Sequence, residues 1–233
     1  MARTIVALYD DLSLAHHVIR DLNQAGIPRE HISLVANDAA REYAAYLQGT
    51  RPVEHVGPGE GATFGATVGA LTGALVALGT ALIPGVGPVI AAGPLVSTLT
   101  GAVTGAIAGG ATGGIVGALL ELGMPEAEAN LYAEGVRRGG SLITVHAANN
   151  DEAKRAEQTM NRHNPVDMER RAALWREIGW KHFNPADQPY TASQVARNRA
   201  AYRNLDAQAE TQPSRSNLNY TRSYDSPDKA ARV

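Results

Sequence analysis

Hydrophobic and polar residues in the first forty positions follow the pattern of a strand, a helix and a second strand. Residues 4–9 and 31–36 are short runs rich in β-branched side chains. Between them the apolar positions recur at helical spacing, at Leu14, Val18, Ile19 and Leu22. Asp11 or Ser13 is placed to cap this helix, and Gly26 is placed to end it.

A similar pattern returns after Gly123. Residues 124–140 predict a helix closed by paired glycines, and residues 141–147 predict a strand. A helix over 150–164, capped by Asn150 or Asp151, and a last strand over 166–170 follow. Joined to the first unit, these elements give an α+β fold of the ferredoxin-like split βαβ type. Strands from both halves must then share one sheet.

The segment between the two halves contains no Asp, Glu, Lys, Arg or His from residue 61 to residue 120. We expect a helical hairpin here, with helices over 61–83 and 94–122 joined by an uncharged loop. Glycines recur in both helices at a four-residue step, at Gly61, Gly65, Gly69, Gly73, Gly101, Gly105, Gly109, Gly113 and Gly117. Each glycine inside a water-exposed helix costs about 1 kcal/mol relative to alanine. The glycines therefore predict grooves in which helices pack closely and chains self-associate.

Two interpretations of this hairpin are open. About 22 helical residues extend ~33 Å, against roughly 30 Å for the hydrocarbon core of a bilayer. All 21 Lys and Arg lie on the flanks, so a hairpin in the bacterial cytoplasmic membrane would keep both termini cytoplasmic. The alternative is a homo-oligomer or filament in the cytoplasm, a scaffold whose hairpins form a shared dry core. In either case the partner is a second copy, and in the first it is also the lipid bilayer.

Composition argues against several other functions. The formal net charge of -2 gives no basic face for nucleic acid, and the chain has no cysteine. The glycine-rich residues 56–65 lack the GK[ST] ending of a phosphate loop. The histidines show no metal-ligand spacing, and no carboxylate pair or catalytic triad stands out. We expect a non-enzymatic protein with no catalytic residue, cofactor, metal or evident small-molecule substrate.

The last part of the chain combines aromatic and basic residues. This tail module, residues 171–205, contains one expected helix that begins near Thr191. Its candidate contact residues are Trp175, Arg176, Trp180, Lys181 and Phe183. They predict either a membrane-surface contact or a hook that packs on the sheet domain. The polar residues 206–233 have the composition of a flexible tail.

The expected organisation is therefore the first half of the sheet domain with a connector (3–60), the glycine-zipper hairpin (61–122), the second half of the sheet domain (123–170), the tail module (171–205) and the flexible tail (206–233).

Several stretches resemble bacterial general stress proteins, including those described as heat- or low-temperature-induced. They are ALYDDLSLAHHVIRDLNQAGIPREHISLVAND, the turn IPGVGPVIAAGP, and LGMPEAEANLYAEGVRRGGSLITVHA. The resemblance covers about residues 3–165, and WREIGWKHFNPADQPYTASQVARNRAAY is similar to a tail module that follows such domains. It implies a stress-linked bacterial protein without an established reaction, and it transfers no catalytic residue to this chain.

Overall fold

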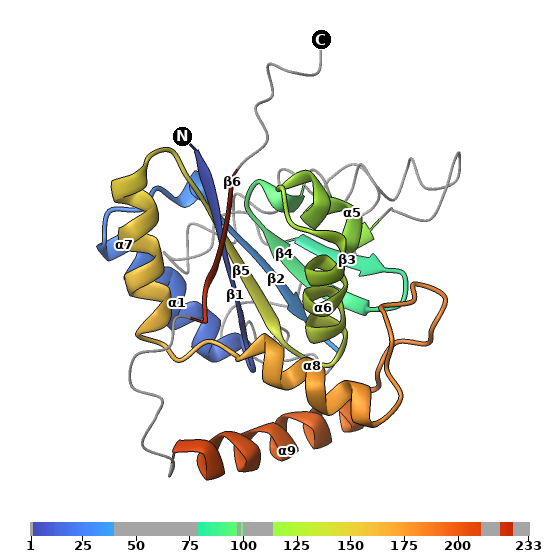
Figure 1. The fold of residues 1–233 in the computed structure, drawn as a ribbon. Coiled ribbons are helices and arrows are strands. Elements are labelled where there is room, and N and C mark those ends of the chain that lie inside the picture. The colour runs from blue at the N-terminus through green and yellow to red at the C-terminus, as the bar shows by residue number, and fades with distance from the viewer. Residues whose placement is uncertain (1, 40–78, 97–98, 100–113, 211–219, 226–233) are drawn as a thin grey trace, which may run out of the picture.

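The computed structural model describes residues 2–39, 79–96, 99, 114–210 and 220–225. In these residues the fold is α+β, with a six-stranded antiparallel sheet and helices on both faces (Figure 1). The strands are β1 (Arg3–Tyr9), β2 (Ile32–Asn37), β3 (Gly79–Ile83), β4 (Gly87–Ala92), β5 (Ser141–Ala147) and β6 (Arg222–Asp225). They lie in the order β3-β4-β2-β5-β1-β6.

The helices form two layers with the sheet between them. Their bounds are α1 (Leu12–Gln24), α5 (Gly114–Glu121), α6 (Glu126–Arg137), α7 (Asn150–Asn161), α8 (Met168–Glu177) and α9 (Ala192–Glu210), with a 3-10 turn η1 (Arg29–His31) before β2. Figure 1 shows α1 and α7 on one side of the sheet and α5, α6 and α8 on the other. The last helix, α9, runs along the end of the domain below α8.

The strands before and after the apolar segment share one sheet, as predicted. Both β1 and β2 pair antiparallel with β5, which lies between them. The connection from β1 to β2 runs through α1, whose N-cap is Asp11: its carboxylate accepts a hydrogen bond of 2.8 Å from the Leu14 N–H. For α7, the cap is Asn149 rather than the predicted Asn150 or Asp151.

Alternate strand residues face two separate apolar cores. The first core lies between the sheet and helices α1 and α7, and includes Ile5, Leu34 and Ile143. The second core lies on the opposite face, under α5, α6 and α8, and includes Leu8 and Leu142. This period-two alternation explains why neighbouring residues of one strand are buried on both sides.

The predicted hairpin differs from the structure around its loop. Residues 79–83, predicted as the end of the first helix, form β3 instead, and residues 87–92 of the predicted loop form β4. Gly85 and Gly87 have φ values of +75° and +97°, which allow the tight turn between the strands. The β-branched residues of β4 then face both cores, and β4 pairs with β2. The loop expected outside the domain is thus part of the sheet.

The predicted helix over 94–122 is also interrupted. Residues 95, 96 and 99 are helical, and α5 begins at Gly114. The φ value of Gly114 is +77°, which an α-helix interior does not allow. Residues 61–78 and 100–113 lie outside the described residues. Within the part of the chain that the structure describes, no helix is both long enough and apolar enough to cross a membrane.

The predicted last strand, residues 166–170, is wrong in most of its length. Only the Val166 N–H bonds to β1, at 2.8 Å from the Leu8 oxygen. Asp167 caps α8 by accepting a hydrogen bond of 3.0 Å from the Arg170 N–H. The strand that pairs with the outer edge of β1 is β6, which lies in the predicted flexible tail. Strand β6 is held at the edge of β1 by backbone pairing, and its polar side chains gave no sign in the sequence that it forms a strand.

Candidate functional site

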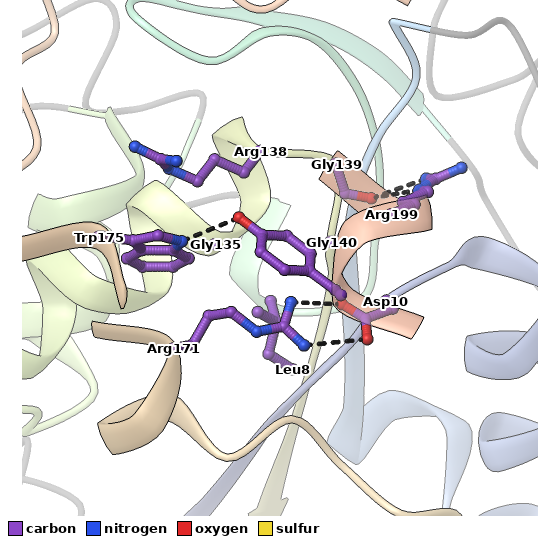
Figure 2. Close-up of a pocket in the computed structure, with 10 residues that line it drawn as sticks. Leu8, Asp10, Gly135, Arg138, Gly139, Gly140, Arg171, Trp175 and Arg199 are labelled. Carbon is purple, nitrogen blue, oxygen red and sulfur yellow. Dashed lines mark hydrogen bonds and ion pairs between the residues drawn. The ribbon is translucent and has the colours of Figure 1, made fainter. Parts of the chain in front are cut away.

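The tail module meets the junction of α6 and β5 around a small pocket (Figure 2). The pocket has room for about one water molecule. The lining residues come from β1, the end of α6, α8 and α9: Leu8, Asp10, Gly135, Arg138, Gly139, Gly140, Arg171, Trp175, Arg199 and Tyr202. We call them the arginine–aromatic pocket.

The end of α6 contributes an ion-pair cluster. Glu134 is fully buried, and its carboxylate accepts hydrogen bonds from Arg138 Nε at 2.5 Å and from Arg137 Nη1 at 3.2 Å. Burial alone would lower the pKa of Arg138, but the charge of Glu134 and its hydrogen bond outweigh this effect and raise the pKa. The Arg138 guanidinium also lies 4.9 Å from the centre of the Trp175 ring, within cation–π range.

A second ion pair joins α8 to the end of β1. Arg171 donates to both carboxylate oxygens of Asp10, at 2.8 Å and 3.2 Å. Such a two-pronged pair fixes the orientation of both groups. The same guanidinium stacks 3.6 Å from the centre of the Tyr202 ring, and Tyr202 accepts a hydrogen bond of 2.9 Å from the indole N–H of Trp175. One arginine therefore links β1, α8 and α9.

Helix α9 is held against the turn before β5. Arg199 Nε and Nη2 both donate to the Gly139 oxygen, at 3.1 Å and 2.7 Å. Gly139 has a φ of +110°, and a Cβ atom placed there would lie 2.4 Å from Val195 Cγ1. The absence of a side chain at Gly139 thus lets α9 approach the turn closely.

The five tail residues selected from the sequence occupy different environments. Trp175 and Phe183 are buried in the second core. Trp180 is half-buried and packs edge-on against Trp175, with ring centres 5.7 Å apart. Arg176 and Lys181 are exposed. The aromatic residues of this segment thus pack on the sheet domain.

Most of the glycine-zipper residues lie outside the described residues, namely Gly61, Gly65, Gly69, Gly73, Gly101, Gly105, Gly109 and Gly113. Gly117 is described: it lies in α5 and is half-buried. Contacts connect α5 to α6.

Sequence reasoning did not find the arginine–aromatic pocket. It assigned no contact role to Asp10, Arg138, Arg199 or Tyr202. Asp10 follows β1, Arg138 follows α6, and Arg199 and Tyr202 lie on α9, so no spacing along the chain relates the three groups. A signal was available for Trp175 and Arg171, which belong to the aromatic and basic cluster of the tail module.

The chemistry of the pocket suits attachment of the tail module. The carboxylate of Asp10 is paired with Arg171, and that of Glu134 with Arg137 and Arg138. Among the residues with described positions, no group of His, Asp and Glu is arranged to hold a metal ion.

Comparisons with protein-family models, with curated proteins and with solved structures found no match to this chain.

Proposed function

We propose that this chain is a non-enzymatic protein that self-associates through its glycine-zipper segments, with the sheet domain as the folded unit beside them. In this proposal, strands β6, β1, β5 and β2 form the ferredoxin-like part of the sheet. The resemblance to general stress proteins supports a role in a bacterial stress response.

One observation carries the proposal. Residues 100–113 are uncharged and keep the four-residue glycine step, and the residues on both sides of them are anchored in one apolar core. Leu95 and Leu99 precede the segment, Ile115 and Leu119 follow it, and all four are buried in the second core. A single helical crossing of a bilayer takes about 20 residues. Residues 100–113 are fewer than this, and the chain on both sides of them is buried in the second core. This favours association with the equivalent segments of other copies.

Anchoring in or on the cytoplasmic membrane, with the sheet domain on the cytoplasmic side, is the second candidate. The absence of charge over residues 61–78 and 100–113 favours it, because uncharged segments outside the two cores require a partner or a lipid environment. The two candidates share the zipper and differ in what surrounds it.

The test compares leucine substitutions on and beside the glycine line. Gly69→Leu with Gly105→Leu should reduce the size of the assembly in light scattering, because the added side chains fill the grooves. Ala70→Leu with Ala106→Leu is the matched control: in a helix it places the same leucine side chain about 100° away. Equal assembly sizes for both pairs would refute the zipper. Retention in carbonate-washed membranes would select the second candidate, and a large complex in the supernatant the first.

A further inference from the structure

The outer edge of β1 is an acceptor for an extended segment from far along the chain. Four residues of β6 pair antiparallel with residues 3–6, in the register Arg3 opposite Asp225 and Val6 opposite Arg222. The Val166 N–H continues the edge by bonding to the Leu8 oxygen. The residues that fill this edge of the sheet therefore lie far from β1 in the sequence.

Side chains on both faces of β6 are recognised by the domain. Arg222 Nη2 lies 2.6 Å from Glu169 Oε1 on α8, and the Tyr224 hydroxyl bonds to the Glu128 carboxylate on α6. On the other face Asn161, at the end of α7, bonds to the Thr221 hydroxyl at 3.0 Å and accepts the Tyr220 N–H at 3.2 Å. Backbone pairing together with contacts to alternate side chains is how extended peptides bind sheet edges.

Strand β6 lies at the edge of the sheet, where residues 222–224 are half-buried and residue 225 is exposed. It is held by the hydrogen bonds to Glu169 and Glu128 and by packing of Tyr224 against the second core. A segment held in this way opens by local rather than global unfolding. It is joined to α9 through the polar residues 211–219.

We propose that this edge is a peptide-acceptor site that binds residues 220–225 of a second copy of the chain, so that copies exchange their C-terminal strands. Strand β6 makes the same contacts whether it binds its own chain or a second copy. The closed and exchanged forms differ only in the effective concentration of β6, which residues 211–219 set by joining it to its own domain. Exchange of an identical element is a low-cost route to a dimer. The exchange does not depend on the glycine zipper and extends self-association to a second, separate contact.

Disulfide trapping in the full chain tests the exchange, because the natural sequence has no cysteine. One chain carries Arg3→Cys, and a second, size-tagged chain carries Asp225→Cys. Opposite residues of an antiparallel pair have Cα atoms roughly 4.5–5.5 Å apart, within disulfide range. Mild oxidation of the mixture should give a disulfide-linked heterodimer. Its yield should fall at least threefold when the Asp225→Cys chain also carries Tyr224→Ala.

The matched control replaces Arg3→Cys by Arg29→Cys, the same change at an exposed arginine beside β2, three strands from β6. Equal heterodimer yields with the two arginine variants would overturn the proposal. So would a double variant, Arg3→Cys with Asp225→Cys, that closes only within one chain while the mixture gives no heterodimer. Repeating the mixture with Gly69→Leu and Gly105→Leu separates the two contacts, since a zipper failure leaves the heterodimer in place.

Discussion

The close approach of α9 to the turn at Gly139 makes a specific prediction about stability. Gly139→Ala places a non-glycine residue at a φ of +110° and brings its Cβ to 2.4 Å from Val195 Cγ1. The backbone strain costs about 1–3 kcal/mol, and the overpacking adds roughly 1–3 kcal/mol. Because the steric conflict lies at the contact with α9, the helix must move away from the turn.

Gly179→Ala is the matched control. Gly179 also has a positive φ, +90°, but a Cβ there meets no atom within 4 Å. It therefore pays the strain alone, and the entropic benefit of alanine in the unfolded chain, about 0.4–1 kcal/mol, is common to both variants. The free energy of unfolding of Gly139→Ala should fall below that of Gly179→Ala by about 1–3 kcal/mol.

Urea denaturation followed by tryptophan fluorescence measures this difference, because Trp175 lies in the same pocket. Val195→Ala removes the opposing methyl groups, so in that background Gly139→Ala should cost no more than Gly179→Ala. The resulting coupling energy between positions 139 and 195 should be about 1–3 kcal/mol. Equal midpoints for the two glycine variants, or a coupling energy near zero, would refute the steric account of α9 docking.

Two further predictions concern stability. Trp175→Ala should lower the free energy of unfolding in urea by about 3–5 kcal/mol, because it empties a buried site and removes the hydrogen bond to Tyr202. Trp175→Phe should lose less than half as much, and a loss as large as that of Trp175→Ala would contradict the packing argument. Burial alone would raise the carboxyl pKa of Glu152, but hydrogen bonds from His31 and the Ala148 N–H lower it. A lowered folded-state pKa stabilises the protein above the unfolded value near 4.5, and this contribution is lost as the pH falls through the folded pKa. Glu152→Gln should therefore be less stable than wild type at pH 7, with a gap that narrows toward pH 3; a gap independent of pH would exclude the carboxylate as its source.

Local sequence patterns were sufficient where polar and apolar residues contrast. The helical spacing of Leu14, Val18 and Leu22 predicted α1, and of the two predicted caps, Asp11 and Ser13, the structure uses Asp11. The run over 141–147 predicted β5 with the bounds that the structure has. In α1 one face meets the core and the other meets water, so the period of the sequence reports the conformation directly. Strand β5 is buried on both faces, and its signal was a short apolar run after paired glycines.

The same reasoning failed over residues 79–92 because the segment has no polar face. Without that contrast, periods of 2.0 and 3.6 residues cannot be distinguished, and the glycines fit a close-packed helix as well as a turn. The hairpin of β3 and β4 is fixed by two tertiary contacts. Strand β4 pairs with β2, and Gly85 lies against Pro185. Both partners are distant in sequence.

By itself the sequence determined the first β-α-β unit, the strand β5 and helix α7 of the second, their shared sheet and the uncharged segment between them. The tertiary structure alone decided that β6 completes the edge of β1, and that Arg138, Arg171 and Arg199 converge on one pocket. The intrinsic strand propensity of four polar residues is too weak to predict β6, and the sequence around an arginine does not show which residue it will contact. Both acquire their roles from backbone groups and charges that only the folded chain brings within reach.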